Sequence, residues 1–254
     1  MFCWCVYHVR YGTEVIIPSK IKDKTVTKII DSQYYETKAF IRKEITKVII
    51  PDTVTYIGAN AFRDNPLTSL DLGNGVKAIG WEDFAWNYLE NMTFPPSLKE
   101  IGPTIFLSNR LTQIPSLDNI TKLGGGAFSC NSVSGDDKFI YGKTDYTVLN
   151  SYAGHWVSEL DIPSRVKRLS YYSLRYTKVN IVNLTEGLEV IDDSAFFQSD
   201  SHTVNIPSSI KSVSSRVFSK ATNLKTININ RKEGVIAGAP WSAPNATLNW
   251  TGTN

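Results

Sequence analysis

The sequence predicts a solenoid in which about nine coils of 22 residues stack along one axis. A residue that is usually aromatic recurs at this interval, and further apolar columns recur with it. A single 22-residue unit has one apolar side, which it can bury only against neighbouring units. The 254 residues therefore divide into stacked coils, and not into one or two domains that each surround a single core.

The aromatic column is the clearest of the repeating positions. Its members lie 22 residues apart in each half of the chain, and a gap of 46 residues separates the halves. The gap equals one repeat plus 24 residues, which predicts an insertion within an unbroken register. Spacings of 28 before Phe62 and 23 after Phe218 add one member at each end. The nine predicted members are Tyr34, Phe62, Phe84, Phe106, Phe128, Leu174, Phe196, Phe218 and Trp241.

Other apolar columns share this period and define the parts of each unit. Apolar residues stand five and eight positions before the aromatic residue, and earlier still two apolar residues alternate with other residues, as in a half-buried strand. Proline follows that strand in four units and ends it, because proline cannot donate to a sheet ladder. The pattern thus predicts that each unit consists of a short strand, a turn, a second extended or one-turn helical segment, and a polar segment that returns the chain to the next strand. The column five positions before the aromatic residue contains Ile29, Ile57, Ile79, Ile101, Leu123, Leu169, Ile191 and Val213. The column eight positions before it contains Val26, Val54, Val76, Leu98, Ile120, Val166, Leu188 and Ile210.

The alternating pairs predict where the first strand of each unit lies. In the fourth unit Ile114 is followed by Ser116 where an apolar partner is expected, so we expect a short strand there. The other pairs are Val48 and Ile50, Leu70 and Leu72, Met92 and Phe94, Leu160 and Ile162, Val182 and Leu184, and Val204 and Ile206.

One polar column is also informative. Asparagine stands three residues after the aromatic position in four successive units, at Asn65, Asn87, Asn109 and Asn131. A stacked asparagine can bond the backbone of adjacent coils through both its carbonyl and its amide group, which satisfies buried loop groups. The second half has Thr177, Ser199 and Ala221 at this position, so we expect a looser or wetter bend there.

These columns together resemble the leucine-rich repeats of the BspA-like surface-antigen type. Two units carry the resemblance, Leu67-x-x-Leu70-x-Leu72-x-x-x-Val76-x-x-Ile79-Gly80-x-x-x-Phe84-x-x-Asn87 and Ile50-Pro51-x-x-Val54-x-x-Ile57-Gly58-x-x-Ala61-Phe62. The resemblance implies an α/β repeat, a right-handed leucine-rich-repeat solenoid with short strands on the concave face and turns or one-turn helices opposite. It also implies a cell-surface or secreted protein that serves adhesion or protein binding and has no catalytic activity.

The resemblance extends over about residues 15 to 250 and includes the insertion. Residues 139–149 resemble the β-hairpin that interrupts such arrays. The predicted segments are a leader or N-terminal edge cover (1–14), repeats (15–131), an inserted hairpin (132–155), repeats (156–229) and a C-terminal cap (230–254).

The titratable residues do not converge on a catalytic or metal site. His155 lies at the end of the insertion and His202 at a repeat boundary, far apart in sequence. Cys3, Cys5 and His8 form a C-x-C-x-x-H run, but a structural zinc site requires a fourth ligand and usually a wider cysteine spacing. We therefore expect no enzyme, no cofactor and no metal ion.

Charge and hydropathy argue against two classes of partner. The 27 Lys and Arg residues nearly balance 24 Asp and Glu, and a net charge of +3 is too small for a nucleic-acid or anionic-membrane binder. The apolar stretches are far shorter than the ~18 residues that cross a bilayer, so we expect no membrane insertion. The start of the chain lacks a basic leader and a small-residue cleavage site, so we predict no signal peptide in it.

The candidate binding residues belong to two groups. Side chains that flank the buried positions of the predicted strands point outward, because successive side chains alternate, and would line the concave sheet where repeat proteins commonly bind. The aromatic residues Tyr141 and Trp156 lie in and just after the insertion, which is a usual place for a separate binding feature. The candidates on the sheet are Lys47, Ser69, Asp71, Asn91, Thr93, Gln113, Glu159, Asp161, Asn183 and Asn205.

The predicted function is a non-enzymatic module that binds an extracellular protein or glycan, as in surface adhesion. The alternative is a structural spacer, or a fibre or tail component without a dedicated ligand, for which a polar face without anchors would be sufficient. A binder should show saturable binding, whereas a spacer should not. An enzyme would require converging groups with perturbed pKa values, which the sequence does not contain.

Overall fold

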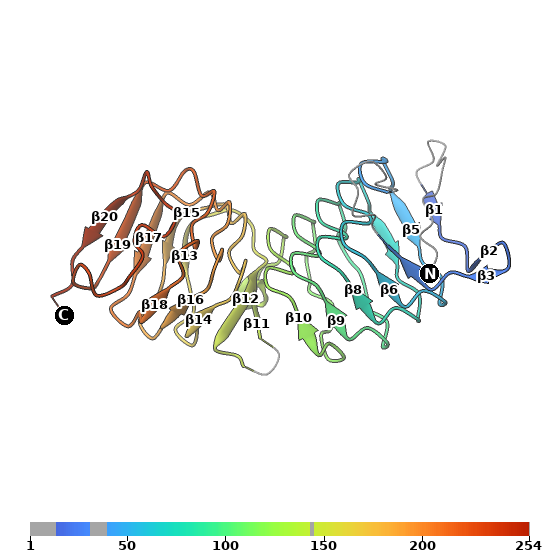
Figure 1. Cartoon of the computed structure of the whole chain (residues 1–254), viewed down its shortest axis with the longest axis horizontal. Helices are drawn as coiled ribbons and strands as arrows, with labels where there is room; N and C mark the ends of the chain where they lie inside the picture. Colours follow the sequence, from blue (N-terminus) through green and yellow to red (C-terminus); the bar gives the residue numbers. More distant parts are fainter. Residues whose placement is uncertain (1–13, 31–39, 143–144, 254) are drawn as a thin grey trace. The chain divides into compact units, whose positions relative to one another are not determined.

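The computed structural model describes residues 14–30, 40–142 and 145–253. It divides into two compact units, Met1–Ser134 and Gly135–Asn254. Each unit is a β-solenoid whose coils contribute short parallel strands to two sheets (Figure 1). Four residues discussed above lie outside the described ones: Cys3, Cys5 and His8 of the predicted leader, and Tyr34, the first predicted member of the aromatic column, whose positions we call aromatic slots.

In the first unit, the first strands of the coils, which precede a turn at proline or at Gly73, form a three-stranded parallel sheet, β1-β5-β7. The strands that carry the isoleucine column form a five-stranded parallel sheet, β10-β9-β8-β6-β4, and β2 and β3 form a small antiparallel hairpin. The strands are β1 (Glu14–Ile16), β2 (Lys20–Ile21), β3 (Lys24–Thr25), β4 (Lys28–Ile29), β5 (Lys47–Ile49), β6 (Tyr56–Ile57), β7 (Ser69–Asp71), β8 (Ala78–Ile79), β9 (Glu100–Ile101) and β10 (Lys122–Leu123).

The second unit repeats this plan, with longer strands in the sheet that contains β13 and β15. One sheet, β13-β15-β17-β19-β20, is entirely parallel, and the other, β11-β12-β14-β16-β18, is parallel except where β11 pairs with β12. The elements are η1 (Gly135–Lys138), β11 (Phe139–Tyr141), β12 (Val148–Tyr152), β13 (Val157–Asp161), β14 (Arg168–Leu169), β15 (Val179–Asn183), β16 (Val190–Ile191), β17 (Thr203–Ile206), β18 (Ser212–Val213), β19 (Thr226–Ile229) and β20 (Thr247–Trp250).

The segment that carries the aromatic residue is built from turns, and the described residues contain no α-helix. In most coils, residues two positions before and two after the aromatic slot have positive φ, as Glu82 (56°) and Trp86 (55°) do around Phe84. A left-handed residue interrupts a right-handed helix, so a helical turn cannot form across this segment. Of the two predicted forms, each coil therefore uses a two-residue strand followed by a turn.

The predicted apolar columns form the core. The described aromatic-slot residues are fully buried, and those of the isoleucine column are buried except Leu123, which is half-buried. In the first unit the phenylalanine rings stack on one another, with centroids 5.5 Å apart between Phe62 and Phe84 and 5.8 Å between Phe84 and Phe106. In the second unit Trp241 fills the last slot, packs near Trp250 and is fully buried.

The first aromatic slot was assigned wrongly from the sequence. Phe40, which lies 22 residues before Phe62, is buried and stacks on it at 4.9 Å. The interval of 22 therefore continues through Phe40, and the prediction that Tyr34 fills this slot is incorrect. The six extra residues lie between Ile29 and Phe40, whose separation is 11 where other units have five.

The asparagine column binds successive coils together as predicted. Asn87 Nδ2 donates to the carbonyl oxygens of Phe84, in its own coil, and Phe62, in the preceding coil, each at 3.1 Å. Its Oδ1 accepts from the Leu67 backbone N–H at 3.1 Å. Asn65, Asn109 and Asn131 make the same contacts with their own neighbours, and all four side chains are buried.

The second unit replaces these asparagine contacts with contacts of shorter hydroxyl side chains, and Ser199 Oγ also bonds Ser201 Oγ at 2.8 Å. Thr177 Oγ1 donates to Leu174 O within its own coil at 2.7 Å, and Ser199 Oγ donates to Thr177 O in the preceding coil at 3.4 Å. Neither hydroxyl bonds the aromatic-slot carbonyls of both coils as the asparagines do. Both residues are nevertheless buried, as is Ala221 at the same position.

The predicted insertion forms a hairpin, but it also supplies a coil strand. β11 and β12 pair antiparallel, and β12 then pairs in parallel with β14, with Leu149 opposite Leu169. Leu149 is fully buried and therefore occupies the isoleucine column, which the sequence analysis did not assign to it. Phe139, Ile140 and Tyr152 are buried too, so the strands of the hairpin are packed into the unit.

Two coils of the first unit lack the strand that the sequence predicts. Residues 91–94 and 113–116 form no strand, although the Met92–Phe94 pair fits the pattern, and only a short strand was expected in the second segment. No backbone hydrogen bond of the described chain joins either segment to a neighbouring coil. Pro115 stands where a ladder residue would donate, and it has no N–H. The prediction that Asn91, Thr93 and Gln113 lie on strands is therefore wrong.

We predict that Phe84→Ala lowers the free energy of unfolding by about 3–5 kcal/mol, because it opens a cavity in the fully buried phenylalanine stack. Urea denaturation measures this, with Glu90→Ala, at an exposed position of the same region, as the control. A change below about 0.5 kcal/mol, typical of surface substitutions, would mean that the column is not the core.

We also predict that Asn87→Ala lowers the free energy of unfolding by more than about 2 kcal/mol, because it leaves a buried N–H and two carbonyl groups without this partner. Asn74→Ala is the matched control, since the Asn74 side chain is exposed. Equal stability of the two variants in the same urea titration would contradict the stabilising role of the Asn87 hydrogen bonds.

Candidate functional site

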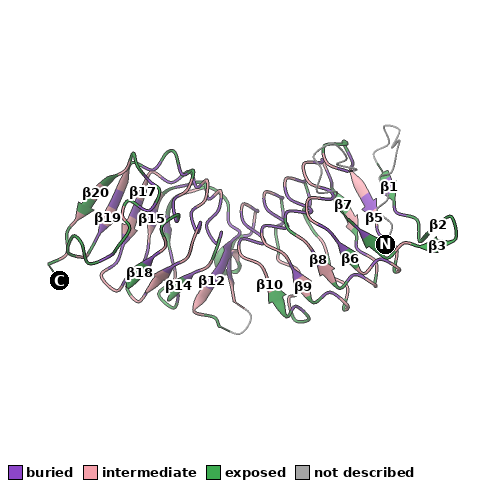
Figure 2. Cartoon of the chain, in the orientation of Figure 1, coloured by how far each residue is buried: buried purple, intermediate pink, exposed green. Residues whose placement is uncertain are grey.

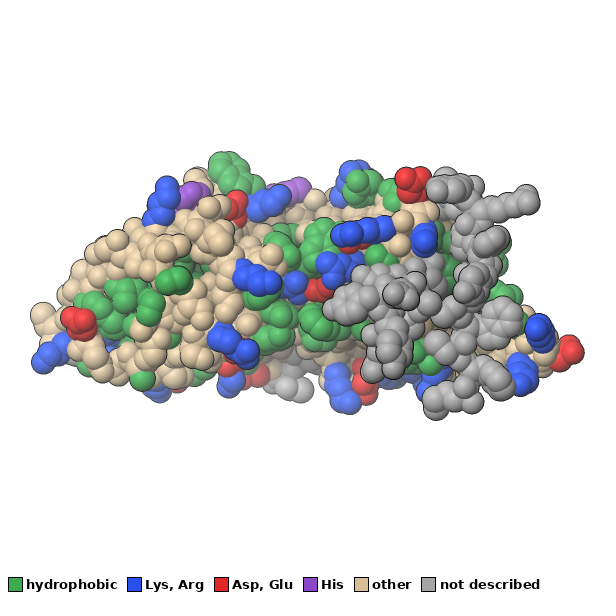
Figure 3. Space-filling view, turned by 45° about the horizontal axis from the view of Figure 1, so that its top comes forward, with side chains coloured by type: hydrophobic (Ala, Val, Ile, Leu, Met, Phe, Trp, Pro, Cys, Tyr) green, Lys and Arg blue, Asp and Glu red, His purple; other side chains and the backbone are tan. Residues whose placement is uncertain are grey.

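The described residues contain no group of three His, Cys, Asp or Glu side chains that could hold a metal ion. No helix in that part of the chain has the length and apolar character that crossing a bilayer requires. On the face drawn in Figure 3, Lys and Arg side chains are scattered among uncharged ones. The polar surfaces of the sheets are therefore the candidate binding surfaces.

The outer face of the β13-β15-β17-β19-β20 sheet is the most regular polar surface among the described residues. In β17 and β19, buried residues alternate with half-buried ones that face outward, as the sequence predicts (Figure 2). The parallel register places one asparagine of each strand above the next. We call this row the asparagine ladder; its members are Asn183, Asn205, Asn228 and Asn249.

Each amide of the ladder donates to the preceding strand. Asn249 Nδ2 donates to Asn228 Oδ1 at 2.9 Å, Asn228 Nδ2 to Asn205 Oδ1 at 2.7 Å, and Asn205 Nδ2 to Asn183 Oδ1 at 2.5 Å. All these bonds point toward β13, so the side-chain dipoles align in one direction. The aligned bonds fix the orientation of each amide group.

Two carboxylates end the ladder on β13. Asn183 Nδ2 donates to Glu159 Oε1 at 2.6 Å and to Asp161 Oδ1 at 2.7 Å. Glu159 and Asp161 are both exposed, so the negative charge at this end faces solvent. The structure thus brings together four predicted site residues: Glu159, Asp161, Asn183 and Asn205.

A second row runs beside the ladder and is also free of basic residues. Its members, in register from β13 to β20, are Glu159, Ile181, Thr203, Thr226 and Thr247. The face therefore offers hydroxyl and amide groups, with an acidic end.

The chemistry of this face suits binding. An amide in the middle of the ladder uses one N–H and one oxygen lone pair, and a further donor and acceptor face outward. Adjacent strands lie about 4.8 Å apart, so these groups repeat at that interval. Hydroxyl and peptide groups of a partner can bond to such a row. Amides and threonine hydroxyls do not ionise near neutral pH, so these groups provide no general acid or base.

The predicted site residues of the first unit do not form a comparable row. Lys47 pairs with Glu14 at 2.8 Å, and Asp71 Oδ1 accepts from the Gly73 N–H within its own turn. Ser69, in β7, pairs with Lys47, in β5, and is exposed. Asn91, Thr93 and Gln113 are exposed but lie outside any strand, as described above.

The two aromatic candidates lie in different parts of the second unit. Tyr141, in β11, is half-buried under the Arg165 guanidinium, 4.9 Å from the ring centroid. Burial raises the pKa of the Tyr141 phenol, and the charge of Arg165 acts in the opposite direction. Trp156 is 62% exposed and directly precedes β13, in the other sheet. The structure provides no contact that joins them into one site.

Sequence reasoning missed Asn249 as a ladder residue because it was assigned to the cap. The signal was present, since Thr247-Leu248-Asn249-Trp250 repeats the pattern of Thr226-Ile227-Asn228-Ile229 at an interval of 21. Asn228 was likewise not among the predicted binding residues. The bonds between neighbouring amides depend on side-chain orientation, which no spacing rule provides.

Comparison with known proteins gives the chain a family. The family model described as "BspA type Leucine rich repeat region" matches residues 33–140 and 148–238 in six copies. A comparison with curated proteins returned no match.

Solved structures share the fold. A leucine-rich repeat protein from Eubacterium ventriosum is 27% identical with a TM-score of 0.68, and the match covers 93% of this chain and 65% of that one. The pneumococcal vaccine antigen PcpA is 22% identical with a TM-score of 0.54, and the match covers 92% of this chain and 62% of that one. The chain thus spans less than two thirds of the length of either. Since the family model matches well over half of its residues, the chain belongs to the BspA-type leucine-rich repeat family.

Proposed function

We propose that the chain is a non-enzymatic recognition module that binds an extracellular protein or glycan through the asparagine ladder and its acidic end. The observation that carries the proposal is the unbroken row of side-chain hydrogen bonds from Asn249 to Asp161. A row whose groups are already oriented loses little entropy when a partner bonds to it.

The composition of the face determines which partners suit it. Interface hot spots are enriched in Trp, Tyr and Arg, and the two outward rows contain none of these residues. A compact apolar epitope would therefore find no anchor there. An extended polypeptide or a glycan chain, which carries polar groups at regular intervals, can bond several ladder positions at once.

A role in adhesion at the cell surface is part of this proposal. It is supported by membership in the BspA-type family and by the repeat architecture, in which partners commonly bind along a sheet. The absence of catalytic activity is proposed on the same basis.

A structural spacer is the second candidate, and one observation favours it. The ladder amides bond to one another at every step from β13 to β20, so the row is held together even without a ligand. Stacked amide rows of this kind stabilise cross-β assemblies that have no ligand.

The two candidates are separated by an array of glycans and extracellular-matrix proteins probed with the full chain. We predict saturable binding to at least one component, and Asn205→Lys should weaken it by about tenfold or more, because a long charged side chain blocks the centre of the ladder. Asn74→Lys, an exposed asparagine of the first unit, makes the same charge change and should leave the affinity unchanged.

The absence of any saturable component would favour the spacer. Binding that is insensitive to Asn205→Lys but lost in Tyr141→Ala or Trp156→Ala would move the site to the hairpin region. Thermal unfolding of each variant shows whether the substitution has changed the fold.

A further inference from the structure

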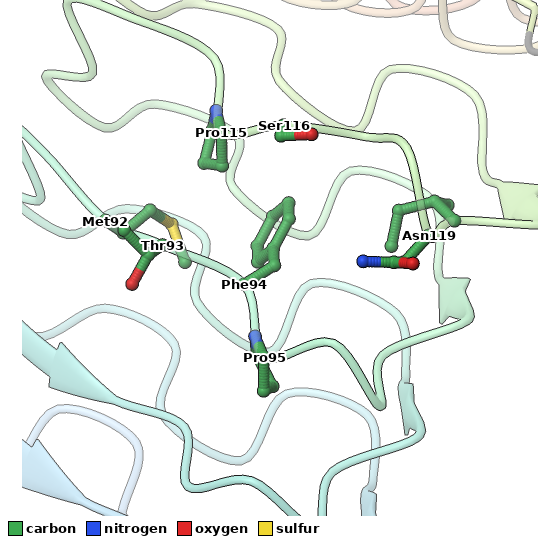
Figure 4. Close-up of a pocket in the computed structure, with 8 residues that line it drawn as sticks. Met92, Thr93, Phe94, Pro95, Pro115, Ser116 and Asn119 are labelled. Carbon is green, nitrogen blue, oxygen red and sulfur yellow. The ribbon is translucent and has the colours of Figure 1, made fainter.

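The first unit contains a hollow that the proposed function does not use. It has a volume of about 260 Å³ and lies between the two coils that lack the predicted strand (Figure 4). One coil contributes Met92, Thr93, Phe94 and Pro95, and the next contributes Pro115, Ser116, Asn119 and Ile120.

The sequence explains why the space is open. Ser116 stands at the position where other coils carry Ile50, Leu72 or Phe94, so the fourth coil leaves part of the core position unfilled. No backbone hydrogen bond of the described chain draws residues 91–94 and 113–116 together. The Phe94 ring consequently remains half-buried, with Phe106 beneath it at 5.7 Å between centroids.

The polar groups at the rim are neutral. The Asn119 amide points toward the Phe94 ring (Figure 4), and neither it nor the Thr93 hydroxyl bonds another described residue. The Ser116 hydroxyl is engaged with Asp118, to which it donates at 2.7 Å. No charged side chain lines the hollow, so it has no group that selects an ion.

The backbone around the hollow does not suit an added peptide strand. Strand addition requires a row of alternating N–H and C=O groups along one edge. Pro115 interrupts that row in one coil, and Pro95 and Pro96 end it in the other, because proline has no N–H. A ligand here must therefore be recognised mainly by side chains.

We propose that this hollow binds one neutral sugar ring of an oligosaccharide. An aromatic face carries partial negative charge and attracts the weakly positive C–H groups on the flat side of a pyranose. Sugar hydroxyls both donate and accept, as do the Asn119 amide and the Thr93 hydroxyl beside the ring. The volume is below the roughly 300–1,000 Å³ of sites for drug-sized ligands, which limits the occupant to about one ring.

The test uses the full chain and four neutral hexasaccharides: maltohexaose, cellohexaose, mannohexaose and chitohexaose in its N-acetylated form. Isothermal titration calorimetry and saturation-transfer difference NMR should show that at least one binds. Asn119→Ala, at an exposed position, should weaken that binding roughly three- to tenfold through loss of hydrogen bonds. Phe94→Leu keeps an apolar group against Phe106 but removes the aromatic face, and a similar loss is expected.

Asn74→Ala is the matched control for Asn119→Ala and should bind like the parent chain. Three outcomes would overturn the proposal: no hexasaccharide binds at millimolar concentration, Asn119→Ala and Phe94→Leu bind as tightly as the parent, or a proline-rich peptide competes with the sugar for the hollow. The site is independent of the asparagine ladder, so Asn205→Lys should leave hexasaccharide binding intact even if it abolishes the array binding described above.

Discussion

The stacking of each side chain on its counterpart in the next coil is the constraint on which each unit depends. In the first unit the phenylalanine rings from Phe40 to Phe128 stack at 4.9 to 5.8 Å, and the asparagines three residues later join the same coils through buried hydrogen bonds. Both contacts require the same interval of 22 residues. A change of register in one column would therefore break the other, which explains why the two columns keep the same spacing.

The same constraint produces the candidate binding face. Once Val204 and Ile227 are fixed in the core by stacking, the alternation of the strand sends Asn205 and Asn228 outward in register, at hydrogen-bonding distance. The ladder is thus a consequence of the core period, because no separate device is needed to align its amides. Where the period fails to supply an apolar residue, at Ser116, the result is the hollow beside Phe94. Regular and irregular coils therefore give two surfaces of different chemistry.

Much of this architecture could be predicted from the sequence, because burial in a solenoid imposes one period on many columns. The core, the hydrogen bonds of the asparagine column between coils and the outward position of Asn205 all follow from that period and from strand alternation. Three features did not. Tyr34 was assigned to the position that Phe40 fills, because an aromatic residue on either side of the six-residue expansion fits the pattern. Leu149 was not assigned to the isoleucine column, because the hairpin alters the spacing there. The missing strand at residues 91–94 depends on pairing with neighbouring coils, which the alternation of Met92 and Phe94 does not report.

The claim that stacked coils orient a rigid row of amides is tested most directly by hydrogen exchange of the asparagine side-chain NH₂ groups, followed by NMR. The hydrogen-bonded N–H of Asn205 and Asn228 should exchange more slowly than either N–H of Asn74, whose exposed side chain bonds no other described residue. Exchange at the same rate in all three residues would show that the amides move independently, and would contradict the account of an ordered binding face.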